Sequence, residues 1–344
     1  MGDDKNKDLW VLMETKEDGS VRSSSLELMN PGIEIARKKN GRMIAIVLSA
    51  DVDKAVKQIE RYGADEIIVV QGEVYKEYTT EIYAETLCHL IEKYKPMGLL
   101  IAATNNGRDI APRIACRLKT GLTADCTSVD IDEETGCLLW TRPTLGGNLM
   151  ASILCQNHWP QMGTIRPGTY KMKECLKKDT KIKKENVILK QDINKIKVYE
   201  TLYEDKTEVD FENAEIIVAG GKGMGSSEGF QMLNELADAL GGMVGATRGA
   251  VEQGWISHAH QIGQTGRMVS PKLYIACGIS GAVQHIVGMS SANIIIAINQ
   301  DSSAPIFQVA DYGIVGDVQK IIPELIKKVE ERKSAKNKSI LGKK

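Results

Sequence analysis

The sequence has few of the features that mark secreted, metal-binding or membrane-spanning proteins. Its seven cysteines are scattered and form no C-x-x-C pair, so no disulfide framework, zinc site or iron–sulfur cluster is indicated. No apolar run approaches the roughly 20 residues that cross a bilayer, and the acidic start MGDDKNKDLWVLMET is unlike a signal peptide. We therefore expect a cytoplasmic protein with no membrane span, whose cysteines are buried free thiols in a reducing compartment.

An excess of charge of one sign is also absent. Lysine and arginine total 44 and aspartate and glutamate total 45, which gives a net charge of -1 at pH 7. Nucleic-acid binders gain most of their affinity by neutralising phosphates with a basic surface, so we expect no nucleic-acid partner. Hydrophobic residues make up 42% of the 344 residues and charged residues 26%, which suffices for sizeable cores and suggests two domains.

The first part of the chain alternates short apolar runs with helical patterns. Strands are predicted over 9–15, 43–50, 66–70 and 98–104, with helices between them, for example over 51–61 and 76–94. Strands that are apolar on both faces and separated by helices predict a parallel sheet covered on both sides. Shorter alternating runs over 126–156 predict a hairpin-like β excursion, and the lysine-rich stretch 171–197 is interpreted as a connector or domain edge.

A second α/β pattern follows. Its predicted elements are strands over 214–221, 242–245, 272–278 and 293–299, and helices over 226–240, from Gly281, and from about 317 to 331. The prediction is an α/β protein of two α/β domains with mainly parallel sheets. The N-terminal domain spans 1–205, a Rossmann-like C-terminal domain spans 206–332, and a charged tail covers 333–344.

Two glycine-rich turns of the second domain lie where a predicted strand is followed by a helix. They are Gly220-Gly221-Lys222-Gly223-Met224-Gly225-Ser226-Ser227 and Gly278-Ile279-Ser280-Gly281-Ala282-Val283-Gln284-His285. Glycines let a ligand approach the backbone, and a helix N-terminus favours phosphate. Such turns also occur without a ligand, and the first one fits neither the Walker pattern nor G-x-G-x-x-G with a downstream acid. A lone histidine on a short helix is more often structural than functional.

Two further loops of this domain offer polar groups. In Gly245-Ala246-Thr247-Arg248 the arginine either stacks on a planar ring or stays solvated at the rim. The loop Gln261-Ile262-Gly263-Gln264-Thr265-Gly266 offers amide and hydroxyl groups to a heteroaromatic edge. Because ligands of open α/β sheets bind outside the carboxyl ends of the strands, the four loops together predict a dinucleotide cleft. No nucleophile–base pair, G-x-S-x-G elbow or paired carboxylates accompany them, which favours holding a redox cofactor over breaking a bond.

Longer stretches of sequence give a family resemblance. Residues 244–317 contain GQTG, SPKLYIACGISGAVQH, AIN-x-D and APIFQVADYGIVGD, and the first domain contains NNGRDIAPRIACRLKTGLTADC, RPTLGGNLMA and TIRPGTY. Together these motifs resemble electron-transfer flavoprotein alpha subunits over nearly the whole chain except the tail. The resemblance implies that the C-terminal domain binds FAD.

The resemblance also implies roles for individual residues. Arg248 would lie over the isoalloxazine, and Thr265 would direct its hydroxyl at flavin N5. The turn that ends at His285 would hold phosphate and place a positive or donating imidazole at the N1/O2 edge, where it would stabilise the negative charge that an added electron brings. Asn299 and Asp317 would meet the adenosine end. The implied cofactor-binding set is Lys222, Thr247, Arg248, Ile262, Gly263, Gln264, Thr265, Ser280, Gly281, Ala282, Val283, Gln284, His285, Asn299 and Asp317.

Two positions depart from the family pattern. Lys222 stands where family members often carry arginine, which keeps the charge but loses the planar fork. Thr247 replaces a frequent serine and keeps the hydroxyl.

The implied function is that of an electron carrier rather than a stand-alone enzyme. The N-terminal domain would dock a homologous beta subunit to form a heterodimer, with the flavin domain on a connector near 200–212, and an acyl-CoA dehydrogenase would be the redox partner. In a bifurcating member, electrons come from NADH at a second FAD in the beta subunit, and ferredoxin or flavodoxin would be a separate acceptor. A simple carrier would instead pass electrons from dehydrogenases to a quinone reductase. Resemblance to anaerobic bacterial members favours the bifurcating type.

Two classes outside the family remain as alternatives at this point. A deacetylase-like NAD-dependent enzyme can share the cleft architecture, but it usually carries a zinc module, which these cysteines do not supply. The other alternative is a nucleotide-binding structural subunit with no redox role.

Overall fold

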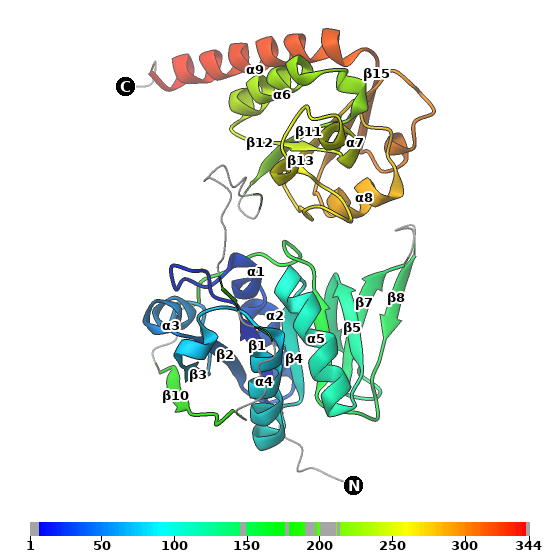
Figure 1. Cartoon of the computed structure of the whole chain (residues 1–344). Helices are drawn as coiled ribbons and strands as arrows, with labels where there is room; N and C mark the ends of the chain where they lie inside the picture. The colour runs from blue at the N-terminus through cyan, green and yellow to red at the C-terminus, as the bar shows by residue number, and fades with distance from the viewer. Residues whose placement is uncertain are drawn as a thin grey trace. The chain divides into compact units, whose positions relative to one another are not determined.

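The chain forms two compact units, Met1–Thr201 and Leu202–Lys344 (Figure 1). The computed structural model describes residues 7–144, 149–175, 179–189, 196, 198–199, 211 and 214–341, and their side chains as far as residue 334. The expected connector near 200–212 lies outside the described residues, apart from Phe211. Each unit contains its own parallel sheet, so the predicted α/β class with mainly parallel sheets is confirmed.

The N-terminal unit is built on a seven-stranded sheet with the order β10-β3-β2-β1-β4-β9-β5. All its strand pairs are parallel. The strands are β1 (Leu9–Met13), β2 (Met43–Ser49), β3 (Glu66–Gln71), β4 (Gly98–Ala102), β5 (Leu122–Cys126), β9 (Gln161–Ile165) and β10 (Lys181–Glu185). β1, β2 and β4 are buried at every residue, as expected for the middle of a sheet that is covered on both faces.

Helices cover both faces of this sheet (Figure 1). They are α1 (Ser23–Leu26), α2 (Met29–Lys38), α3 (Asp53–Glu60), α4 (Thr80–Tyr94) and α5 (Asn105–Leu118), with a short 3-10 helix at Glu73–Tyr75. Successive side chains of a strand point to opposite faces. Val11 and Met13 of β1 therefore join the core that contains α2 and α3, whereas Trp10 and Leu12 join the core that contains α4 and α5.

A separate three-stranded antiparallel sheet confirms the expected β excursion over 126–156. It consists of β6 (Ser128–Ile131), β7 (Leu138–Pro143) and β8 (Met150–Ile153). The centre of the RPTLGGNLMA block, residues 145–148, lies outside the described residues. β8 is an edge strand, and it exposes 55% of Met150 and 36% of Ile153 next to Leu149, which is 71% exposed.

The lysine-rich stretch 171–197 is not only a connector. Its residues Lys181–Glu185 form β10, which pairs in parallel with β3 at the edge of the sheet. The strand has no buried residue, so it lacks the apolar signal on which the sequence prediction depended. Charged edge strands are common because charge discourages pairing with other chains.

The C-terminal unit has a five-stranded parallel sheet in the order β12-β11-β13-β14-β15. The strands are β11 (Ile216–Gly220), β12 (Met243–Ala246), β13 (Leu273–Cys277), β14 (Ile295–Asn299) and β15 (Tyr312–Val315). The helices are α6 (Ser227–Leu240), α7 (Arg248–Glu252), α8 (Val283–Met289) and α9 (Val318–Leu341), with 3-10 helices at Lys222–Met224, His258–His260 and Pro305–Gln308. α9 extends well beyond the expected end near 331, into the segment expected to be a tail.

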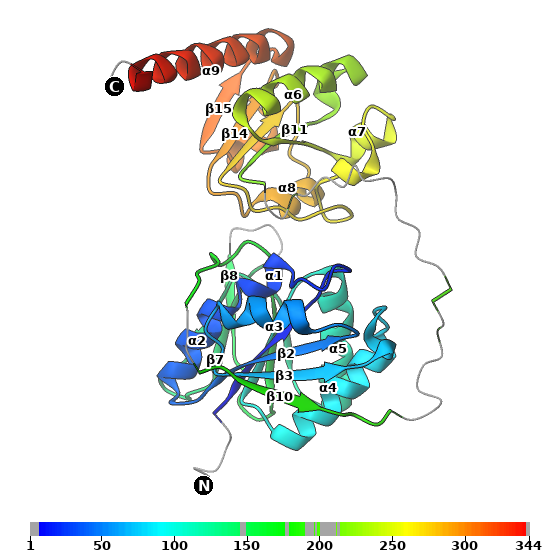
Figure 2. The same ribbon diagram turned by 90° about the vertical axis from the view of Figure 1, so that its left-hand side faces the viewer.

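Each face of this sheet packs against a different set of helices. α6 and α9 pack with Val218 and Ile298 on one face, and α8 and the 3-10 helix at Pro305–Gln308 pack with Ile217 on the other (Figure 2). β12 and β13 lie on opposite sides of β11, so the strand order reverses there. In open α/β sheets a crevice forms at such a switch point, outside the carboxyl ends of the strands.

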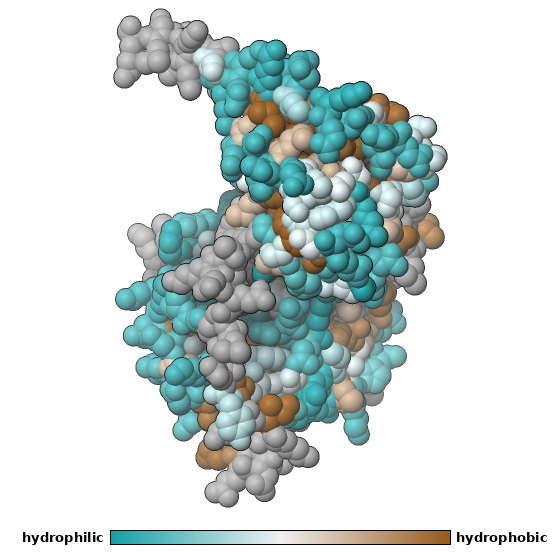
Figure 3. Space-filling view, turned by 45° about the horizontal axis from the view of Figure 1, so that its top comes forward, coloured by the Kyte–Doolittle hydropathy of each residue, from teal (hydrophilic) through white to brown (hydrophobic). Residues whose placement is uncertain are grey.

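The surface carries no extended apolar belt in the view of Figure 3, where hydrophilic residues cover much of the visible face and apolar residues form small separate patches. Among the described residues, no helix has both the length and the apolar character needed to cross a membrane.

Candidate functional site

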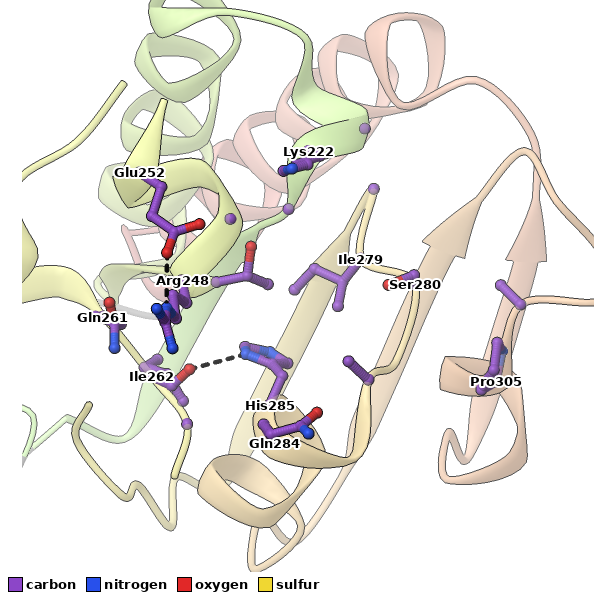
Figure 4. Close-up of a pocket in the computed structure, with 18 of the residues that line it drawn as sticks. Lys222, Arg248, Glu252, Gln261, Ile262, Ile279, Ser280, Gln284, His285 and Pro305 are labelled. Atoms are coloured by element: carbon purple, nitrogen blue, oxygen red, sulfur yellow. Dashed lines mark hydrogen bonds and ion pairs between the residues drawn. The ribbon is translucent and has the colours of Figure 1, made fainter. Parts of the chain in front are cut away.

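A cavity of about 610 Å³ lies at the carboxyl ends of β11, β12, β13 and β14 (Figure 4). Its lining is contributed by the turns that follow these four strands and by the loop before β13. The lining residues are Gly221, Lys222, Gly223, Thr247, Arg248, Gly249, Glu252, Gln261, Ile262, Gly263, Gln264, Thr265, Gly278, Ile279, Ser280, Ala282, Gln284, His285, Asn299, Asp301, Ala304 and Pro305. The four loops that the sequence analysis singled out therefore meet at one place.

The turns after β11 and β13 are joined backbone to backbone. The Gly221 N–H donates to the Cys277 carbonyl oxygen at 3.0 Å, and the Gly223 N–H donates to the Gly278 carbonyl oxygen at 2.9 Å. A Cβ atom on Gly221 would lie 2.3 Å from the Gly278 carbonyl oxygen, closer than any side chain can approach. Glycine is required here because the two turns touch, and this contact brings both backbones to the cavity wall.

The turn after β13 presents a row of backbone donors. Within the described parts of the chain, the N–H groups of Ile279, Ser280, Gly281 and Ala282 donate to no protein acceptor. Ile279 and Gly281 are buried, and buried N–H groups are nearly always hydrogen-bonded in folded proteins. Successive N–H groups of this kind form a concave anion site. A phosphate is therefore the type of group that this turn fits.

Two cations border the cavity. The stem of Lys222 passes over Gly249, where an added Cβ would lie 2.8 Å from Lys222 Cε, and no carboxylate of the described residues pairs with its ammonium group. Arg248 is held differently, because its Nε donates to Glu252 Oε1 at 2.8 Å (Figure 4). The Arg248 side chain is 66% exposed and the Glu252 side chain 55%. Arg248 is thus solvated and ion-paired at the rim, and its place over a flavin ring stays a prediction.

The loop before β13 carries an ordered hydroxyl. The buried Gln261 amide nitrogen donates to Thr265 Oγ1 at 3.0 Å. This bond uses a lone pair of the hydroxyl and leaves the Thr265 O–H free to donate. The loop itself is fixed against α8, because the Gln264 N–H donates to the Gln284 carbonyl oxygen at 2.7 Å and Gly263 adopts a φ of 145°.

His285 lies on α8 at the inner end of the cavity and is only 5% exposed. Its Nδ1 is 2.9 Å from the Ile262 carbonyl oxygen, a contact shown in Figure 4, and its Nε2 is 3.0 Å from the Tyr274 hydroxyl. Burial lowers the pKa of His285 to about 4, although the bond to Ile262 acts in the opposite direction. The imidazole is therefore neutral at pH 7. Of the two forms implied for this ring, positive or donating, burial disfavours the positive one, because desolvation outweighs the hydrogen bond that favours the charged form.

Cys277 ends β13 directly before the Gly278 turn. It is fully buried, and burial raises the pKa of its thiol to about 12. It is one of the free cysteines of the described chain.

Most of the residues predicted for the site line the cavity, but Gly281, Val283 and Asp317 do not. Asp317 lies just before α9, where its Oδ1 accepts from the Gln319 N–H at 3.0 Å. Asn299 lines the cavity, yet both ends of its amide bind the protein. Its Nδ2 donates to the Ile279 carbonyl oxygen at 2.8 Å, and its Oδ1 accepts from the Asp301 N–H at 2.9 Å. Asn299 thus shapes the turn that carries the free N–H groups.

Some lining residues were not predicted from the sequence: Gly249, Glu252, Asp301, Ala304 and Pro305. Glu252 had a usable signal, because residues four apart share one face of a helix and it follows Arg248 at that spacing. Asp301 lies inside the AIN-x-D motif, but its place beside the turn after β13 depends on the pairing of β13 with β14.

A cleft at the switch point of a parallel sheet, lined by free backbone N–H groups and a cation, is the type of site at which α/β proteins bind dinucleotides. Comparison with known proteins narrows the class. Residues 9–189 match the electron transfer flavoprotein domain, and residues 210–290 match the electron transfer flavoprotein FAD-binding domain.

Curated relatives align over almost the whole chain. "Protein FixB" of Clostridium saccharobutylicum is 48% identical and covers 96% of this chain and 98% of its own. "Electron transfer flavoprotein subunit alpha" of Thermoanaerobacterium thermosaccharolyticum is 48% identical over 95% and 99% of the two chains. "Acryloyl-CoA reductase electron transfer subunit beta" of Anaerotignum propionicum is 41% identical over 96% and 97%. The chain therefore belongs to the electron-transfer flavoprotein alpha-subunit family, and FAD is its cofactor.

Proposed function

We propose that the cleft of the C-terminal unit holds FAD and that the chain passes electrons to or from an acyl-CoA dehydrogenase as the alpha subunit of a heterodimer. One observation carries the placement of the cofactor. The free N–H groups of the turn after β13 line the same cavity as the Thr265 hydroxyl and His285. A single cleft thus offers N–H donors for an anion in one part and hydrogen-bonding groups for a heteroaromatic ring in another. A flavin dinucleotide requires both.

The phosphates would be held by the backbone. The N–H groups of Ser280, Gly281 and Ala282 would donate to phosphate oxygens, with the Lys222 ammonium group as the charge partner. Lysine acts here as a point charge rather than as a planar fork, so Lys222 is sufficient for attraction but gives no bidentate contact. Of the predicted residues that do not line the cavity, Gly281 would still take part through its backbone N–H.

The flavin ring would meet side chains whose hydrogen-bonding roles are already assigned by the protein. FAD supplies a ring that accepts and donates electrons one or two at a time. The Thr265 O–H is available as a donor because Gln261 occupies its lone pair. His285 contributes a neutral, fixed imidazole, so its effect on the ring edge is that of an oriented dipole. These groups bind and orient the ring, and none of them is placed to break a covalent bond.

Purification of the full chain together with its beta subunit tests this assignment. We expect a yellow complex with the visible absorption bands of flavin, which dithionite bleaches and an acyl-CoA dehydrogenase with its substrate also reduces. A colourless complex that binds NAD instead would favour a deacetylase-like enzyme. A colourless, inert complex would favour a structural subunit.

The N-terminal unit would supply the surface for the beta subunit. Edge strand β8 presents unpaired backbone groups together with the exposed side chains of Leu149, Met150 and Ile153. An exposed apolar edge of this kind is a hazard for a protein that stays alone in solution. The homologous α/β beta subunit is the occupant that the family membership supports. We expect Met150→Lys to weaken heterodimer formation in size-exclusion chromatography, whereas Val74→Lys, at another exposed apolar residue of the same unit, leaves it intact.

We further propose that the heterodimer works by electron bifurcation. In this mode NADH delivers a hydride to the beta subunit, one electron reaches the acyl-CoA dehydrogenase by way of this chain, and the other leaves to ferredoxin or flavodoxin. The similarity to a subunit named for an acryloyl-CoA reductase supports delivery of electrons toward the acyl-CoA side. Flavin content decides between the modes. A second FAD in the heterodimer together with NADH-driven reduction is expected for bifurcation, whereas a single FAD that NADH does not reduce indicates a simple carrier.

A further inference from the structure

Tyr274 and His285 form a buried pair behind the cleft. Tyr274 is fully buried in β13, and His285 on α8 is 5% exposed. The Tyr274 hydroxyl lies 3.0 Å from His285 Nε2, and the two rings are tilted by 54° with their centroids 6.2 Å apart. His285 lines the cavity, whereas Tyr274 does not. Any effect of Tyr274 on a ligand must therefore pass through the histidine.

The donors and acceptors of this pair can be assigned from chemistry alone. A carbonyl oxygen only accepts, so the Ile262 carbonyl at 2.9 Å requires a proton on His285 Nδ1. In the neutral ring the other nitrogen, Nε2, is then an acceptor, and the Tyr274 O–H donates to it. The two hydrogen bonds connect the Tyr274 hydroxyl, the imidazole and the Ile262 carbonyl in series, and they satisfy the Tyr274 hydroxyl proton and both ring nitrogens.

The alternative protonation state leaves a group unsatisfied. An imidazolium would donate from both nitrogens, so the Tyr274 oxygen would become the acceptor and its hydroxyl proton would need a new partner. Within the described residues, Tyr274 has no second hydrogen-bond partner, and its surroundings are the apolar core of the C-terminal unit. A buried polar hydrogen without a partner is strongly disfavoured, because it has lost its hydrogen bonds to water. The tyrosine thus opposes protonation of the histidine in addition to the effect of burial.

We propose that Tyr274 is a positioning residue of the cofactor site: its buried hydroxyl holds His285 Nε2 as an acceptor and, together with the Ile262 carbonyl, keeps the neutral ring in one orientation toward the cleft. The inference rests on the proposed function only in taking the cleft to be the FAD site. The tautomer itself is a property of the protein.

Imidazole NMR of the full chain tests the proposal without any activity measurement. The five histidines can be labelled with ¹⁵N, and the signals that disappear in His285→Gln identify His285. At pH 7 we expect the parent to show a protonated Nδ1 and an unprotonated, hydrogen-bonded Nε2. In Tyr274→Phe the Ile262 carbonyl still holds a proton on Nδ1, but the Nε2 loses its donor. We therefore expect the Nε2 signal to move to that of a nitrogen without a hydrogen bond, and the ring to take up its second proton at a higher pH than in the parent.

A matched control separates this effect from the general loss of a buried hydroxyl. The Tyr75 hydroxyl lies 2.8 Å from Thr86 Oγ1 in the buried core of the N-terminal unit, so Tyr75→Phe removes a similar group far along the chain. We expect it to leave the His285 signals unchanged. If Tyr274→Phe does not fold, the parent spectrum still decides, since an Nε2–H tautomer or an imidazolium there overturns the proposal.

Flavin retention distinguishes failure of this inference from failure of the proposed function. We expect Tyr274→Phe to retain less FAD than the parent in equilibrium dialysis, because a ring that is no longer held on both nitrogens is less well oriented for the ligand. Unchanged His285 signals in a folded Tyr274→Phe protein refute the positioning role even if FAD is bound. A parent complex that never contains FAD refutes the proposed function, while the tautomer result stands on its own.

Discussion

The burial of a neutral His285 predicts that the C-terminal unit loses stability when the pH falls below 7. Its pKa is lowered from 6.5 to about 4 in the folded protein, mainly by burial. Between these values the unfolded chain binds a proton that the folded chain excludes, so the free energy of unfolding rises with pH through this window. The contribution is fully present above the unfolded pKa and is lost progressively as the pH falls toward the folded pKa. One pKa unit corresponds to about 1.4 kcal/mol.

From pH 7 to pH 5 the expected loss is about 2 kcal/mol from this group alone. The interval is chosen because most carboxylates stay ionised in it. Hydrogen exchange of peptides from β11, β13 and β14, corrected for the intrinsic pH dependence of exchange, measures the unfolding free energy of the C-terminal unit separately from that of the N-terminal unit.

The test compares how the unfolding free energy changes with pH in the parent and in His285→Gln, and not the absolute stability of either protein. His285→Gln has no titrating ring, so we expect its unfolding free energy to fall by about 2 kcal/mol less than that of the parent over the same interval. His258→Gln, at an exposed histidine of the same unit, should keep the parent's pH dependence. Equal slopes in the parent and in His285→Gln would refute the burial of a neutral imidazole.

Three further substitutions test the cleft. Gly221→Ala places a Cβ 2.3 Å from a backbone carbonyl oxygen, and an overpacking cost of about 1–3 kcal/mol predicts that FAD affinity falls by about fivefold or more. Gly72→Ala, where the backbone is extended and the added atom meets nothing closer than 3.5 Å, should retain FAD in the same equilibrium dialysis. Lys222→Met should weaken FAD binding about fivefold at low salt and less at high salt, because an exposed charge is screened. A Lys222→Arg protein that binds FAD as weakly as Lys222→Met would contradict the role of the charge. Glu252→Gln should change the unfolding free energy by less than about 0.5 kcal/mol, since its pair with Arg248 is exposed, and a larger shift in thermal unfolding would show that the pair is structural.

The central strands could be predicted from the sequence because they are buried on both faces. β1, β2 and β4 are buried at every residue and are almost entirely apolar, and β11 and β13 of the other unit have the same kind of apolar run. Edge strands lack this signal. β10 is charged, and all four residues of β15 are exposed, so their pairing depends on neighbours that lie far away in the sequence.

The loops of the site could also be predicted, because glycines after buried strands mark the carboxyl edge of a parallel sheet. The state of the side chains could not. His285 was expected to be positive or donating, but its protonation depends on its burial, which arises from the packing of α8 against neighbours such as Tyr274 of β13. Asp317 belongs to a quoted motif, yet it caps the start of α9 and lies outside the cavity lining. Motif membership therefore located the cleft better than it located the role of each residue.

The enclosure of Cys277 has a chemical consequence for a protein that handles electrons. Thiolates, and not thiols, react readily with peroxides, disulfides and electrophiles. Cys277 lies one residue before the turn that borders the cleft, but its pKa of about 12 keeps it protonated, and its full burial keeps oxidants away. When reduced flavin meets oxygen and releases peroxide, this sulfur is a poor target. The strand that carries the cofactor turn is thereby protected from the oxidants that its own cofactor can generate.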